Sequence, residues 1–149
     1  MWLIIWIAVS MAAGAVGSRF PPGEWYASLK KPNWNPPNSV FGPVWTALYV
    51  LMGMAAWIVW RRAGFARAPL AFGLFFVQLF LNALWPFLFF GVRQPGLALV
   101  EIVVLWLVIL ATMVSFWRVS VAAGMLLLPY LCWVAFATAL NYQLWRLNS

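Results

Sequence analysis

The 149-residue chain contains no histidine, one cysteine and two acidic residues. A single cysteine excludes a disulfide within the chain, and the lack of histidine excludes the usual ligand clusters of zinc proteins. Without histidine, paired carboxylates or an activated nucleophile, the chain also lacks the groups that catalyse hydrolysis or group transfer. We therefore expect no bound metal and no enzyme of those classes.

Charge is scarce as well: 7% of the residues are charged, while 66% are hydrophobic. Soluble domains carry roughly 25% charged and about 45–50% apolar residues, so the composition predicts an integral, multi-pass membrane protein. The net charge of +7 does not indicate a nucleic-acid partner, because the basic residues are scattered between apolar runs and form no stripe. We expect them to contact the headgroups of the lipid bilayer.

Hydrophobic runs predict the architecture, since a membrane helix needs about 20 mostly apolar residues. We expect an all-α membrane bundle, a single domain over residues 1–149, with five transmembrane helices and one long ordered loop after the first. The spans are predicted at about 2–18, 41–60, 70–90, 96–117 and 121–145, and the loop at 19–40. Lysine and arginine are split almost evenly between the two sides, so the positive-inside rule leaves the orientation open.

The loop at 19–40 is polar, basic and rich in proline. Long connections without regular structure are usually lids or binding loops, or else disordered. Disordered segments are poor in aromatic residues, whereas this stretch and its edge contain Trp25, Tyr26, Trp34 and Phe41. We therefore interpret the loop as an ordered lid over a pocket between helices, with disorder as the alternative.

The third predicted span contains Gln78, Asn82 and Trp85, whose spacing of i, i+4 and i+7 places them on one helical face. Amides in hydrocarbon face the bundle interior or a cavity, because lipid would leave them without hydrogen bonds. Pro86 cannot donate to the carbonyl of Asn82. That carbonyl is thus open to a ligand, a water or a neighbouring helix, and a purely structural interhelical hydrogen bond is the alternative.

The fifth predicted span places Trp133, Ala137 and Asn141 on one face. The small Ala137 leaves room beside Trp133 for a flat group. Pro129 is expected to kink this helix.

The end of the same span fits a loose cholesterol-contact pattern through Leu140, Tyr142 and Arg146. An ordinary aromatic and basic helix end is the alternative interpretation, and the one that we favour.

Glu101 lies about one and a half turns inside the fourth predicted span. Intramembrane acids serve in proton relays, but no second intramembrane acid accompanies this one. Placement at headgroup depth, or pairing with a basic residue near a helix end, is the simpler interpretation.

Twelve tryptophans are more than interfacial belts require in so small a bundle. Those near span ends are predicted belt anchors. Four others lie in the loop or on faces that carry polar residues: Trp34, Trp45, Trp85 and Trp133. Aromatic faces stack flat ligands, and each pair adds about 0.5–1.5 kcal/mol beyond area burial.

Several motifs in order along the chain resemble one known family. They are Trp25-Tyr26 and Lys31-Pro32-Asn33-Trp34-Asn35-Pro36-Pro37 in the loop, Trp45-Thr46, Leu48-Tyr49 and Met52-Gly53 in the second span, Gln78, Asn82 and Trp85 in the third, and Pro129-Tyr130, Trp133, Ala137 and Leu140-Asn141 in the fifth. Together they resemble the TspO/translocator-protein (TspO/MBR) family, also called tryptophan-rich sensory proteins. The resemblance covers almost the whole chain.

The resemblance implies a five-helix bundle, commonly a homodimer, with a pocket under the first loop. Members bind porphyrins, and some bind cholesterol and synthetic aromatic drugs, without a required cofactor. Carried over by motif, the ligand-binding residues would be Trp25, Trp34, Trp45, Tyr49, Gln78, Asn82, Trp133 and Ala137, to which the face of the third span adds Trp85. Trp45 and Trp133 match the positions tied to light-dependent porphyrin breakdown.

Three functions remain open on this basis. The first is a membrane protein that binds a porphyrin or another flat apolar ligand, such as a sterol, and senses tetrapyrroles or stress. The second is an enzyme that oxidises bound porphyrin under light, with Trp45 and Trp133 as catalytic residues. The third is a transporter, which the lack of inverted repeats makes weaker. Without histidine, stacking and ion pairs would hold a porphyrin, with Lys30 and Lys31 as the nearest cations for its propionates.

Overall fold

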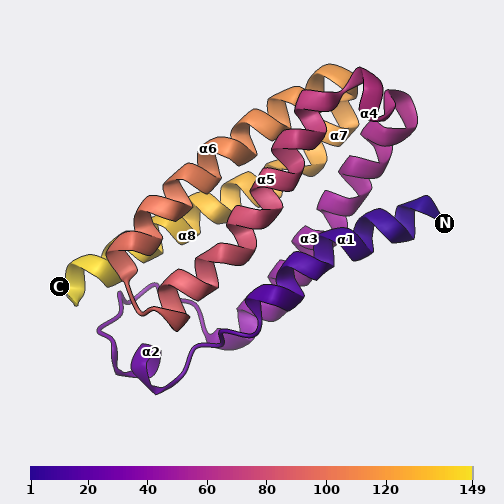
Figure 1. The fold of residues 1–149 in the computed structure, drawn as a ribbon. Coiled ribbons are helices and arrows are strands. Elements are labelled where there is room, and N and C mark those ends of the chain that lie inside the picture. The colour runs from indigo at the N-terminus through magenta and orange to yellow at the C-terminus, as the bar shows by residue number, and fades with distance from the viewer. Residues whose placement is uncertain (149) are drawn as a thin grey trace.

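A computed structural model describes residues 1–148, which form helices and their connectors without any strand (Figure 1). The elements in chain order are α1 (Trp2–Gly17), α2 (Glu24–Ser28), α3 (Asn38–Arg62), α4 (Gly64–Arg67), α5 (Pro69–Pro86), the π-helix η1 (Phe87–Gly91), α6 (Pro95–Val119), α7 (Val121–Leu126) and α8 (Leu128–Leu147).

Four helical segments of the described chain are long and apolar enough to cross a membrane: Asn38–Arg62, Pro69–Gly91, Pro95–Val119 and Val121–Leu147. The prediction of an all-α, multi-pass membrane bundle is confirmed, with four helical segments of membrane-spanning length among the described residues. The predicted first span corresponds to α1, which is apolar but only 16 residues long. At about 1.5 Å per residue it is shorter than the roughly 30 Å hydrocarbon core.

The long helices run side by side, with α1 packed along α3 and α5, α6 between α5 and α8, and α7 against α3 (Figure 1). The lid, formed by the connector from Ser18 to Pro37 with α2 inside it, lies at the same end of the bundle as the C-terminus (Figure 1). The lid is shorter than predicted because α3 already begins at Asn38. Pro37, with ψ of 148°, supplies the extended residue before the first turn.

Proline shapes two of the long segments. Pro86 ends α5, and the helix continues as the π-helix η1 rather than as a regular α-helix. π-helical turns often accompany functional sites. In the last segment the helix is interrupted at Leu127, two residues before Pro129, which divides α7 from α8. The interruption agrees with the predicted kink.

Glycine lets α1 approach α3 closely. A Cβ atom on Gly53 would lie 2.5 Å from Ile7 Cα, and one on Gly14 would lie 2.5 Å from the ring of Tyr49. Close approach through small residues is typical of membrane helix pairs. Small residues recur at every fourth position along α1 and at its C-cap, and of these Ser10 and Gly14 pack within the bundle, while Ser18 is exposed.

A cavity between the helices and beneath the lid

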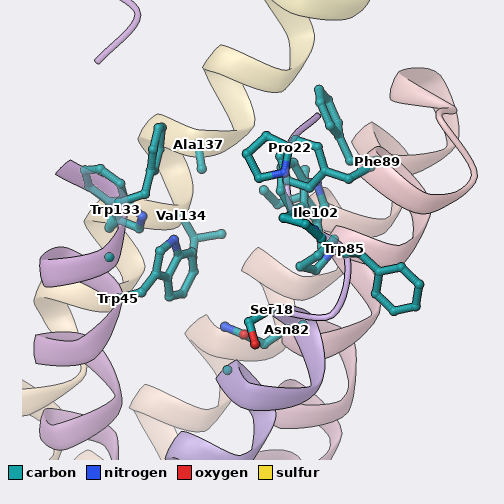
Figure 2. A pocket seen from close by; sticks show the side chains of 18 of the residues that line it. Ser18, Pro22, Trp45, Asn82, Trp85, Phe89, Ile102, Trp133, Val134 and Ala137 are labelled. Carbon is teal, nitrogen blue, oxygen red and sulfur yellow. The ribbon is translucent and has the colours of Figure 1, made fainter. Parts of the chain in front are cut away.

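A cavity of about 600 Å³ lies between the helices under the lid. Its walls come from α1, the lid, α3, α5 with η1, α6 and α8. Figure 2 shows Trp45, Trp133 and Ala137 on one side, with Trp85 and Phe89 across the open space. A concave, mainly apolar site of this size is typical of small-molecule pockets.

The walls of the cavity are aromatic. On one side Trp45 packs beside Tyr49 and Tyr130, at ring-centroid distances of 5.7 Å and 6.2 Å. On the other, Trp85 stacks on Phe89 at 4.8 Å with an interplanar angle of 22°. Ala137 ends at its methyl group between these surfaces, so the space beside it stays open to a flat ligand.

Four side chains form a polar network beside the cavity. The hydroxyl of Tyr49 donates to Asn82 Oδ1, and Asn82 Nδ2 donates to the hydroxyl of Tyr130 at 2.8 Å. Tyr130 then donates to Gln78 Oε1 at 2.7 Å. All four residues are buried, but only Tyr49 and Asn82 line the cavity. The predicted amide face therefore points into the bundle, where three helices share its hydrogen bonds.

A second hydrogen-bonded unit fixes the orientation of Trp85. Its indole nitrogen donates to Asn141 Oδ1 at 2.9 Å, and Asn141 Nδ2 donates to the carbonyl of Pro95 at 2.9 Å. The pair joins α5 to α8 and to the start of α6. The face of Trp85 is thereby held in place.

Three buried polar groups have no hydrogen-bond partner within the described residues: Gln78 Nε2, the carboxyl of Glu101 and the indole nitrogen of Trp133. Buried donors without partners are rare in native proteins. Of the three residues only Trp133 lines the cavity, although its indole nitrogen is itself buried. Glu101 is 7% exposed, and the simple pairing with a basic residue that the sequence suggested is not observed.

The lid is ordered by its own contacts. Lys31 Nζ donates to the carbonyls of Tyr26 and Leu29, at 2.7 and 3.2 Å, and lies 4.7 Å from the centre of the Tyr26 ring. Burial raises the pKa of the Tyr26 phenol above its usual value. Pro21, Pro22 and Tyr26 form the part of the lid that lines the cavity. Lys31 is thus engaged in lid structure.

The structure brings six of the nine predicted ligand-binding residues to the cavity wall: Trp45, Tyr49, Asn82, Trp85, Trp133 and Ala137. The other three lie elsewhere. Gln78 is part of the polar network, Trp25 packs edge-on against Phe89, and Trp34 is 46% exposed beside Phe136. In the sterol-contact pattern, Leu140 lines the cavity, whereas Tyr142 and Arg146 are exposed.

Sequence reasoning missed the contribution of the first helix to the site. Gly14, Gly17 and Ser18 line the cavity, as do Ile102 and Leu105 of α6. The spacing of small residues in the first span was the available signal, but it predicts close helix packing equally well. No group of three or more His, Cys, Asp or Glu side chains suited to a metal occurs among the described residues.

Replacing Tyr49 with phenylalanine is expected to lower stability. The change leaves the buried Asn82 Oδ1 without its donor, and hydrogen bonds between membrane helices contribute about 0.5–2 kcal/mol. Thermal unfolding of the detergent-solubilised protein measures the effect. Tyr142→Phe, at an exposed site on α8, is the matched control and should unfold like the unaltered chain. Equal midpoints for the two variants would contradict the network.

Comparison with known proteins places these features in context. The sequence model of the TspO/MBR family matches residues 5–146. The Translocator protein of Homo sapiens is 49% identical over 138 residues, covering 89% of this chain and 82% of the human protein. The Tryptophan-rich protein TspO of Chlorobaculum tepidum is 45% identical over 151 residues, covering 98% and 95%. Protein CrtK of Rhodobacter capsulatus is 41% identical, covering 97% and 91%.

Proposed function

The chain belongs to the TspO/MBR family, and from that premise we propose that this multi-pass membrane protein binds porphyrins of the protoporphyrin type in the cavity beneath its lid. Binding would serve the sensing of tetrapyrroles or of stress. No cofactor is required for this function, since the porphyrin itself is the ligand.

One observation carries the proposal: an aromatic cavity of about 600 Å³ whose wall includes a buried indole N–H without a partner. A flat macrocycle between Trp45 and Trp133 on one side and Trp85 on the other would cover large apolar faces (Figure 2). The Trp133 N–H would gain an acceptor. Leaving such a donor buried and unpaired costs about 1–3 kcal/mol, and a ligand carbonyl or carboxylate would offset it.

Porphyrin propionates need positive charge near the mouth of the cavity. Lys30 and Arg19 are exposed at the lid end of the bundle, and Arg146 lies on the last turn of α8. We assign the propionates to Lys30 and Arg19 rather than to Lys31, because Lys31 already donates to three lid carbonyls.

Light-dependent oxidation of the bound porphyrin is the second candidate function. The observation in its favour is that Trp45 and Trp133, the two predicted catalytic residues, line the same cavity (Figure 2). An indole can donate an electron to a photoexcited macrocycle, and dioxygen would serve as the oxidant that takes up the electrons and attacks the ring, so this chemistry needs no acid–base pair.

Three finer features of the family stay predictions for this chain. We propose that α1 acts as the fifth transmembrane helix, because it carries no charged residue and local thinning of the bilayer accommodates a short helix. Assembly as a homodimer and binding of a sterol, in contact with Leu140, Tyr142 and Arg146, are likewise implied by the family.

Titration with protoporphyrin tests the proposal. Saturable quenching of tryptophan fluorescence in the dark is expected, weakened about tenfold in Trp133→Phe, which loses the N–H donor. Trp117→Phe, on an outward-facing side chain that is 44% exposed, is the control and should bind normally. Bleaching under light that Trp45→Phe and Trp133→Phe abolish would add the enzymatic function. Quenching that never saturates would overturn the porphyrin assignment.

A further inference from the structure

One side chain, Asn148, ties the lid to the end of α8. The backbone N–H of Lys30 donates to Asn148 Oδ1 at 2.8 Å, and Asn148 Nδ2 donates to the carbonyl of Lys30 at 2.9 Å. A single amide thus pairs with both backbone groups of one lid residue, as a neighbouring β-strand would. The two partners are 118 residues apart in the chain.

Asn148 is itself held by the helix that it follows. Its Nδ2 also donates to the carbonyl of Leu144 at 2.8 Å. The last carbonyls of a helix have no partner within the helix, so this bond caps α8 and fixes the direction of the side chain. Leu144 also lines the cavity. The lid is therefore attached to a rigid element that belongs to the cavity wall.

The aromatic contacts of the lid with the bundle are of a different kind. Trp25 meets Phe89 at a centroid distance of 5.6 Å, Tyr26 meets Phe90 at 5.4 Å, and Trp34 lies 5.5 Å from Phe136, all edge-on. Such contacts hold the lid on the bundle through burial, since Tyr26 is 5% exposed, whereas hydrogen bonds are directional. The two bonds at Asn148 are exposed, and they fix the position of Lys30 relative to α8.

The lid forms part of the cavity wall through Pro21, Pro22 and Tyr26, so movement of the lid changes access to the cavity. We propose that Asn148 is a positioning residue that holds the lid closed and so sets the rate at which ligands enter and leave the cavity. The choice of ligand rests on the proposed function, but the closure of the lid does not.

This role gives a kinetic signature. Asn148→Ala removes both hydrogen bonds to Lys30. It should raise the association and dissociation rates of protoporphyrin together, each about three- to tenfold. The dissociation constant should change less than about twofold, because the walls that contact the ligand are intact. Asn148→Asp keeps the acceptor for the Lys30 N–H but loses the donor to the Lys30 carbonyl. Its rates should therefore lie between those of the unaltered chain and those of Asn148→Ala. Gln143→Ala removes an amide one turn earlier on α8 and is the matched control.

Two measurements separate the parts of the proposal. Hydrogen exchange of the lid peptide, residues 24–36, without ligand reports on opening, and stopped-flow quenching with protoporphyrin gives the rates. Faster exchange in Asn148→Ala but not in Gln143→Ala supports the positioning role, even if protoporphyrin fails to bind and the proposed function is lost. Unchanged exchange overturns it. A larger dissociation constant without a joint rise in both rates also overturns it, because that result indicates a damaged cavity.

Discussion

Ala137→Phe should reduce porphyrin binding at least about tenfold while the bundle remains folded. Ala137 of α8 lines the cavity. It lies beside the tryptophans of one wall and faces the open space that separates them from the opposite wall (Figure 2). A benzyl group added there occupies the volume that a flat ligand would fill. Enlarging a residue costs stability when the core around it is full, but here the new ring enters an existing cavity. Equilibrium titration measures the loss, and thermal unfolding should change little.

Ala139→Phe is the matched control for this prediction. Ala139 lies two residues further along the same helix and is exposed on its outer side. The same added ring therefore points away from the cavity, and binding should be unchanged. Normal affinity in Ala137→Phe would show that the ligand does not lie against this part of α8, and the site would have to be sought elsewhere.

Gly53→Ala is expected to lower the free energy of unfolding by about 2–3 kcal/mol, although it adds only one methyl group. That Cβ would lie 2.5 Å from Cα and 2.7 Å from the backbone nitrogen of Ile7. A backbone cannot move aside by changing a rotamer, so α1 must shift as a whole. Since α1 lines the cavity with Gly14 and Gly17, ligand affinity should fall together with stability.

Gly73→Ala provides the control for Gly53→Ala. A Cβ on Gly73 of α5 meets no atom within 4 Å, so nothing has to move. Alanine also favours helix over glycine by up to about 1 kcal/mol, and the variant should be as stable as the unaltered chain or more so. Thermal and denaturant unfolding in detergent measure the stabilities of the two variants. Equal stability of Gly53→Ala and Gly73→Ala would contradict the close packing of α1 on α3.

Helical spacing was enough to predict the inward faces of two helices. Gln78 and Asn82 are buried as their spacing required, and Trp133 and Ala137 line the cavity together. A periodic pattern identifies which side of a helix is inside, and amides in hydrocarbon must find partners. It does not identify those partners: the hydroxyls of Tyr49 and Tyr130 that join the network come from other helices.

Other features depend on contacts that no local pattern encodes. Small residues such as Gly14 serve either close packing or a cavity wall, and here Gly14 does both. Trp25 and Trp34 belong to the lid but do not line the cavity, because their rings lie edge-on against Phe89 and Phe136. The pairing of Lys30 with Asn148 joins two segments that are 118 residues apart and leaves no trace in the composition of either.

That last pairing also orders events during synthesis. The lid emerges from the ribosome early, yet the side chain that secures it lies 118 residues further along the chain. Contacts between such distant segments form late, because all the intervening chain must first be arranged. The lid therefore stays unsecured until α8 has been made and inserted. A chain truncated before Asn148 would insert its helices but lack a secured lid.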